Sequence, residues 1–194
     1  MVTGRDELSL RHSAQVVSVQ DLKNFVPTNY GTAATGVTAA ERGDSFNHVT
    51  ILTLDTVLPA IAGGADLAVG KLLYTFPAGE LVINSSYMAV AITQTQGNIT
   101  ADTPDVGLGT TIASGAVAVL GGTAAFENVL TGQTAANCNG SITVETVSTT
   151  LIIADAGNHT LYLNVADGWA ASGDAAALLT GLVMINWSYF ANPA

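Results

Sequence analysis

The stretch Leu72–Gln94, LLYTFPAGELVINSSYMAVAITQ, decides the predicted fold. It predicts a strand, a tight turn at residues 76–79 and a long second strand, which together form the central pair of a sheet. The many β-branched residues and the Pro-Gly turn favour sheet over helix. Alternation in the second strand places Leu81, Ile83, Ser85, Tyr87, Ala89 and Ala91 on one face and Val82, Asn84, Ser86, Met88, Val90 and Ile92 on the other. Both faces mix apolar and small polar residues, so the alternation is imperfect.

The rest of the chain predicts further short strands separated by turns rich in Gly, Asn and Asp. The predicted strands cover residues 48–58, 69–76, 81–94, 106–112, 114–120, 141–154, 159–166 and 179–190. Residues 124–132 have apolar side chains at helical spacing and predict one or two turns of helix. A turn signal at Asp155–Gly157 predicts that residues 159–166 return antiparallel beside residues 141–154.

No βαβ spacing is present, so the sequence predicts an all-β fold, an antiparallel β-sandwich. Eight strands in two sheets favour a jelly roll, and a different Greek-key sandwich is the alternative.

The first 47 residues differ in composition from the remainder and hold most of the cations. They predict an extended N-terminal arm, residues 1–47, ahead of a sandwich domain at residues 48–194. The functional interpretation is an arm that reaches onto a neighbouring subunit, and its cations are Arg5, Arg11, Lys23 and Arg42. The alternative is an ordinary first strand packed on the sheet.

Charge is scarce and unevenly distributed. Only 10% of the residues are charged, against roughly 25% in an ordinary globular domain. From Gly43 onward the single cation is Lys71, against 11 acidic residues. An acidic body argues against nucleic-acid binding, which needs cations at the phosphates. A surface so poor in charge predicts burial against copies of the same chain or against another protein.

No set of residues has the spacing of a catalytic, cofactor or metal site. The three histidines, His12, His48 and His159, fall in different predicted elements. The single cysteine, Cys138, is predicted to be buried as a small apolar residue. No run of about 18 apolar residues is present, so no membrane span is expected.

Trp169 and Trp187 are the only tryptophans. Trp187 lies in an apolar predicted strand and is expected in the core. Trp169 lies in a Gly/Ala/Ser loop, where it could pack against the protein's own chain, anchor a contact with another protein or stack on a sugar. With the arm cations Arg5, Arg11, Lys23 and Arg42, Trp169 completes the set of candidate protein-contact residues.

Three stretches together resemble small virion proteins of tailed bacteriophages that decorate or cement the capsid. They are Gly36–Leu54 (GVTAAERGDSFNHVTILTL), Tyr74–Ile83 (YTFPAGELVI) and Leu161–Tyr189 (LYLNVADGWAASGDAAALLTGLVMINWSY). The resemblance implies a trimeric β-sandwich or jelly-roll module that sits on the outer surface of the phage head and clamps neighbouring major capsid proteins. It implies assembly in the host cytoplasm, no enzymatic activity and no cofactor. It assigns no functional residue.

Two other functions stay open at this point. The first is a carbohydrate-binding or host-attachment sandwich that uses Trp169, Tyr162 and loop aspartates. The second is a hydrolase, for which paired loop carboxylates would be needed. Loop aspartates more commonly cap turns, so the structural protein is the preferred prediction.

Overall fold

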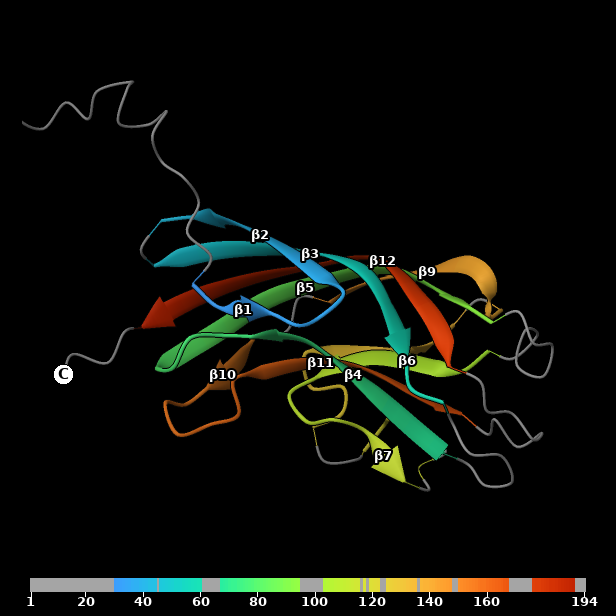
Figure 1. Cartoon of the computed structure of the whole chain (residues 1–194). Coiled ribbons are helices and arrows are strands. Elements are labelled where there is room, and N and C mark those ends of the chain that lie inside the picture. The colour runs from blue at the N-terminus through green and yellow to red at the C-terminus, as the bar shows by residue number, and fades with distance from the viewer. Residues whose placement is uncertain are drawn as a thin grey trace, which may run out of the picture.

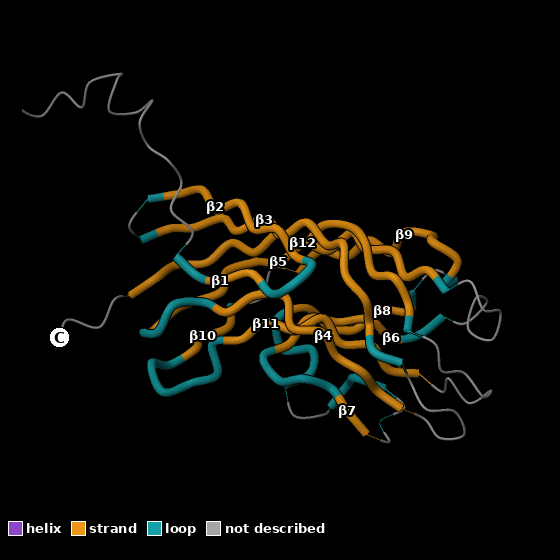
Figure 2. The backbone as a smooth tube through the Cα atoms, viewed as in Figure 1, coloured by secondary structure: helices purple, strands orange, loops and turns teal. Residues whose placement is uncertain are grey.

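The computed structural model describes residues 30–44, 46–60, 67–94, 103–115, 117, 119–122, 125–135, 137–147, 150–167 and 176–190. These ranges contain strands and no helix (Figures 1 and 2). The strands are β1 (Thr32–Ala33), β2 (Val37–Gly43), β3 (Asn47–Leu58), β4 (Leu67–Thr75), β5 (Glu80–Thr93), β6 (Asp105–Gly109), β7 (Ser114–Gly115), β8 (Leu130–Thr134), β9 (Asn139–Val147), β10 (Leu151–Ile153), β11 (Thr160–Asp167) and β12 (Ala177–Phe190).

The strands form two antiparallel sheets that pack face to face as two layers (Figure 1). Sheet A has the order β1-β4-β11-β6-β8, with β7 beside β4. Sheet B has the order β10-β5-β12-β3-β2, with β9 also beside β5. The prediction of an all-β antiparallel sandwich is therefore confirmed.

The expected central pair is wrong in one respect: its two strands are not partners. β4 pairs with β1, β7 and β11 in sheet A, whereas β5 pairs with β9, β10 and β12 in sheet B. The turn at residues 76–79 therefore carries the chain from one layer to the other. Backbone and side-chain groups hold it there, because Phe76 donates its N–H to the His159 carbonyl and Tyr189 donates its hydroxyl to the Ala78 carbonyl.

The second expected hairpin is wrong for the same reason. The predicted strand 141–154 is divided into β9 and β10, and both pair with β5 in sheet B. The next strand, β11, pairs with β4 and β6 in sheet A. A local turn signal indicates that the chain reverses direction, but it does not determine which strand lies alongside. Both turns therefore predict hairpins, whereas in the structure they cross between the sheets.

The imperfect alternation of β5 has a structural cause. Its register with β12 shifts so that Asn186 pairs with Ser85 while Trp187 pairs with Ile83, and Asn84 is left over as a bulge. Before the bulge the core side chains are Leu81 and Ile83, and after it they are Met88, Val90 and Ile92. The inward face thus changes from odd to even positions.

The predicted helix at residues 124–132 is also absent. Residues 125–129 form turns and bends, and β8 begins at Leu130. The predicted strands 106–112 and 114–120 are shorter than expected, as β6 and β7.

The expected boundary of the arm at residue 47 does not match the sheets. β1 and β2 lie within residues 1–47, and they pair with β4 and with β3 respectively. The strands within residues 30–43 thus belong to the two sheets. Residues 1–29 lie outside the described residues.

The core fills the space between the two sheets with apolar side chains. Trp187 and Cys138 are 1% and 0% exposed, which confirms the predicted burial of both. Trp187 packs edge-on against Phe76 and donates its indole N–H to Thr50 Oγ1 at 2.8 Å. The single polar atom of this largest side chain is therefore satisfied inside the core.

The outer side of sheet A is covered by the protein's own chain. Asn164 on β11 points away from the main core and is 0% exposed. Its amide accepts the Ala113 N–H at 2.9 Å and donates to the Thr111 and Phe126 carbonyls at 2.9 and 2.7 Å. Gly70 allows this approach, because a Cβ there would lie 2.4 Å from Asn164 Oδ1. The cover buries a second, smaller apolar cluster, made by Ala68, Ala113, Leu120, Phe126 and Ala166.

Candidate contact surface

The structure describes one of the five predicted contact residues. Arg42 lies on β2, the edge strand of sheet B, and is exposed. Arg5, Arg11, Lys23 and Trp169 lie outside the described residues. Tyr162, named for the carbohydrate alternative, is half-buried on β11.

The outer side of sheet B differs from that of sheet A, because no other described element covers it (Figure 1). Core residues such as Leu52, Met88 and Val183 define its inner side, so the alternate positions point outward. We call these outward positions the open face. Its members are Thr38, Ala40, Arg42, Val49, Ile51, Thr53, Asp55, Val57, Tyr87, Ala89, Ala91, Ile142, Val144, Thr146, Leu178, Thr180, Leu182 and Met184.

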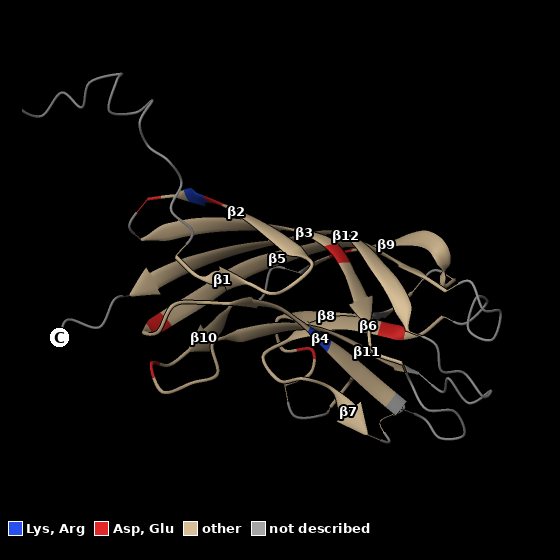
Figure 3. Ribbon diagram, in the orientation of Figure 1, with Lys and Arg blue, Asp and Glu red and all other residues tan. Residues whose placement is uncertain are grey.

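Apolar side chains dominate the open face. Ile142, Val144, Val57 and Leu178 are 66%, 57%, 47% and 42% exposed. In a sheet with one solvated face, the outward positions of each strand are usually polar. Most outward positions of sheet B are apolar instead. Within the open face only Arg42 and Asp55 are charged, as the sparse colouring of the upper layer in Figure 3 illustrates. Such a face is suited to burial against protein.

The dimensions of the open face also suit a protein contact. It spans the five strands β9, β5, β12, β3 and β2. With strands about 4.8 Å apart and about eight residues rising about 3.3 Å each, its plane covers roughly 600 Å². A standard interface buries about 800 Å² on each partner, so the face supplies most of one such interface.

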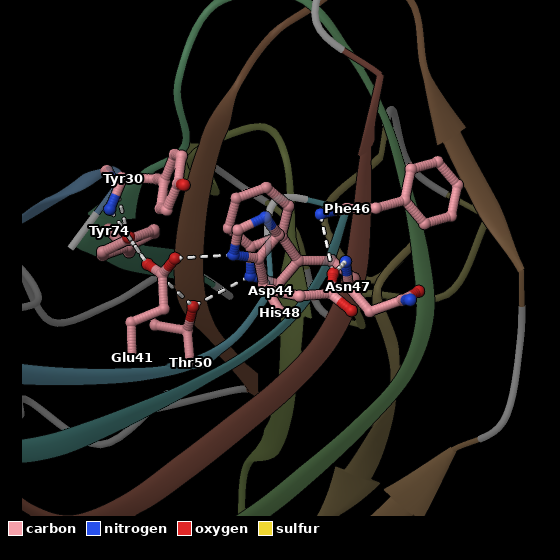
Figure 4. A network of polar contacts seen from close by, with 10 residues as sticks. Tyr30, Glu41, Asp44, Phe46, Asn47, His48, Thr50 and Tyr74 are labelled. Atoms are coloured by element: carbon pink, nitrogen blue, oxygen red, sulfur yellow. Dashed lines mark hydrogen bonds and ion pairs between the residues drawn. The ribbon is translucent and has the colours of Figure 1, made fainter. Parts of the chain in front are cut away.

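A buried polar cluster fixes the edge strand that carries Arg42 (Figure 4). Glu41, on the inner side of β2, is 2% exposed and lies 2.9 Å from His48 Nδ1 through its Oε1. Its Oε2 accepts the Tyr74 hydroxyl at 2.9 Å and the Tyr30 N–H at 3.2 Å. Thr50 Oγ1 approaches the same oxygen at 3.5 Å. One carboxylate therefore joins β2, β3 and β4 across both sheets.

The surroundings of this cluster shift the pKa of Tyr74 and enclose His48. Burial, then the negative charge of Glu41 and the hydrogen bond to it, raise the pKa of Tyr74 well above its usual range. His48 is enclosed by aromatic rings, stacked on Trp187 at 4.3 Å and met edge-on by Tyr30 at 4.6 Å. Its Nε2 is buried and has no hydrogen-bond partner among the described residues.

A carboxylate beside an imidazole also occurs in many hydrolytic active sites. The question is therefore whether a nucleophile and a substrate can reach the imidazole of His48. Such a site needs a nucleophile within hydrogen-bond reach of the free imidazole nitrogen and room for a substrate. Here the His48 side chain is 1% exposed, and in the described part of the chain no hydroxyl or thiol bonds its Nε2. We therefore interpret the cluster as a structural anchor for β2.

Sequence reasoning missed this pair, although a signal for it was present. Gly43 and Asp44 mark a turn between two strand-like runs, and a hairpin there aligns Glu41 with Thr50 and Gly43 with His48. Glu41, His48 and Thr50 then share the inner side. Polar residues at inward positions of a predicted hairpin could have identified the cluster.

A hollow of about 340 Å³ adjoins the Arg42 end of the open face. Its polar lining includes Asn47, Asn84 and Asn186 from three neighbouring strands. Asn84 donates to Ser188 Oγ at 3.0 Å, and Ser188 donates to Asn47 Oδ1 at 3.1 Å. This ladder ends the apolar part of the sheet.

The Asp44 turn closes one side of the hollow. Its carboxylate accepts the N–H groups of Asn47 and Phe46 at 2.6 and 2.8 Å. These two backbone hydrogen bonds lower the pKa of Asp44. The loop between β2 and β3 is thus fixed by its own side chain.

Comparisons of the chain with protein-family models, with curated proteins and with solved structures found no match. Among the described residues, no three His, Cys, Asp or Glu side chains gather as a metal site would require. None of the described segments is a helix of the length and hydropathy that a membrane crossing needs.

Proposed function

We propose that this chain is a structural, non-enzymatic virion protein that decorates and cements a phage capsid by bridging neighbouring major capsid proteins on the outer shell. The observation that carries the proposal is the open face of sheet B. A face of this size and composition is unfavourable in water and favourable when another protein covers it. The major capsid protein and identical copies of the chain are the proposed partners, with the head surface as the place of action.

The order of the strands supports the finer part of the proposed architecture. Eight of them run β3-β12-β5-β9 in one sheet and β4-β11-β6-β8 in the other. Consecutive members of this set repeatedly change sheet, as β3 to β4 and β4 to β5 do. We propose that the sandwich is a jelly roll in which the short strands β1, β2, β7 and β10 are additions at its margins.

A cement protein also gains from repetition. One contact of modest area is repeated at every equivalent site of a shell, and linked contacts bind far more tightly than single ones. The trimeric state that the resemblance implies would link three such contacts. The twofold pair inferred below is an alternative to that trimer, and sedimentation of the purified chain distinguishes the two.

The first test locates the chain. Purified phage particles are labelled with an antibody against it and imaged by electron microscopy. We expect label on the outer surface of the heads. Heads without label, or label confined to tails, would overturn the proposal.

The second test concerns the open face. Val144→Lys places a charge on the face, and we expect at least about a tenfold loss of binding to heads that lack the protein, because a buried unpaired charge is costly. Val119→Lys is the matched control, since the two valines are 57% and 56% exposed and only Val144 lies on the open face. Equal binding by both variants would show that this face makes no contact on the shell.

A further inference from the structure

We infer that the open face is where two copies of this chain meet, sheet B against sheet B, around a twofold axis that runs across the strands between Ile51 and Thr53. The inference rests on the proposed contact role of the same face and names the partner that covers it. It follows from three properties of the face: the placement of its two charges, the sizes of its side chains and its area.

The two charges are placed symmetrically about that axis. Arg42 pairs with Val49, and Asp55 lies six residues further along β3. The midpoint between the Val49 and Asp55 positions falls between Ile51 and Thr53. A rotation about the axis therefore lays the Arg42 end of one copy over the Asp55 end of the other. Arg42 and Asp55 are one strand apart in sheet B, so they face each other diagonally across the interface, twice in each dimer.

The Arg42 and Asp55 side chains are both exposed, and neither forms an ion pair among the described residues. Two opposite charges on an otherwise uncharged face complement a copy of the same face. The surface of an unrelated protein has no reason to carry the same two charges in the reverse order.

The side chains on either side of the axis fit the same arrangement. One row across the sheet is Thr146, Tyr87, Met184, Ile51 and Ala40, and the next is Val144, Ala89, Leu182, Thr53 and Thr38. The rotation lays the first row of one copy over the second row of the other. Tyr87 then meets Ala89 and Ile51 meets Thr53, whereas Met184 meets Leu182 as an apolar pair on the central strand β12. Large side chains facing small ones can interdigitate, as they do between the sheets of a sandwich.

The area is sufficient for such a pair. Roughly 600 Å² of sheet plane on each copy approaches the about 800 Å² of a standard interface. The exposed Ile142 and Val144 extend the face to its β9 margin. A twofold contact uses the same face on both copies, so no third copy can add through it. The result is a dimer with the outer sides of sheet A facing outward.

The test is a charge exchange followed by analytical ultracentrifugation of the purified full-length chain without shells. We expect wild type to sediment as a dimer at micromolar concentration. Arg42→Asp and Asp55→Arg alone place like charges opposite each other, and each should raise the dimer dissociation constant at least about tenfold. The double variant Arg42→Asp/Asp55→Arg has the wild-type net charge and should restore the dissociation constant to within about threefold of wild type.

Thermal melts of the four proteins check folding, since both sites are exposed and the melting temperatures should agree. A wild-type monomer or trimer would overturn the twofold pair, and so would single variants that do not recover when combined. The shell experiment is separate: a dimer absent from phage heads would refute the proposed function alone, whereas a monomer that binds heads would refute this inference alone.

Discussion

Individual residues at the β2 edge explain why a chain with so few charges buries one of its carboxylates. Glu41 joins three strands, and the side chains that it meets, those of His48, Thr50 and Tyr74, are themselves buried. Burying a carboxylate is unfavourable unless partners compensate, and here His48 and Tyr74 do so. The benefit is an edge strand held in one register, which keeps Arg42 and its neighbours on the outer side.

Removing that carboxylate should therefore be costly. Glu41→Ala leaves His48 Nδ1 and the Tyr74 hydroxyl without their acceptor, and we expect a loss of about 3 kcal/mol or more in the free energy of unfolding. Urea denaturation followed by tryptophan fluorescence measures it, because Trp187 stacks on His48. Glu80→Ala, at an exposed carboxylate, should change stability by less than about 0.5 kcal/mol. Equal effects of the two substitutions would show that the cluster does not anchor β2.

For individual residues, the sequence predicts which side chains are buried but does not predict which side chains contact each other. The burial of Trp187 and Cys138 followed from residue type and from the apolar pattern around Trp187. The contact of Glu41 with Tyr74 joins positions 33 residues apart in different sheets. No local pattern encodes such a contact, because it depends on how the sheets are stacked.

At the scale of the elements, the positions of the long strands were predictable and their partners were not. β3, β5, β11 and β12 begin and end within about two residues of expectation, because β-branched runs end at Pro, Gly or Asp. The residues of the turn at 76–79 predict a reversal of the chain, but they are equally compatible with two paired strands and with two strands in different sheets. The candidate site was predictable only in outline, since scarce charge indicated a contact surface and the sheet order was needed to locate it.

The sheet order also changes what can be removed from the N-terminus. Deletion of residues 1–29 spares β1, β2 and Glu41, so the free energy of unfolding should stay within about 1 kcal/mol of wild type. Deletion of residues 1–45 removes both strands and leaves His48 and Tyr74 unpaired, so we expect a loss of several kcal/mol or no folded protein. Circular dichroism and urea denaturation of the two truncations measure this difference. Similar stability of both would contradict the assignment of β2 to the sandwich.

At the scale of the whole molecule, the two outer sides are treated differently, and this asymmetry limits assembly. Sheet A is covered by residues 110–115 and 125–129, which Asn164 holds in place with three hydrogen bonds. No described element covers the outer side of sheet B. A molecule with one covered and one open outer side can form a dimer through the open side and then has no second side to offer. A molecule with two open sides could bind a further copy on each side and form larger assemblies.

Asn164→Ala should therefore change the assembly as well as the stability. The substitution leaves the Ala113 N–H and two carbonyls without their partner and loosens the cover over Ala68 and Ala166. We expect species larger than the dimer, growing with protein concentration in analytical ultracentrifugation, and stronger binding of a fluorescent apolar dye. Adding Arg42→Asp should reduce the large species, because it weakens the contact on the other side. If Asn164→Ala instead yields a folded dimer at every concentration, the cover over sheet A does not limit assembly.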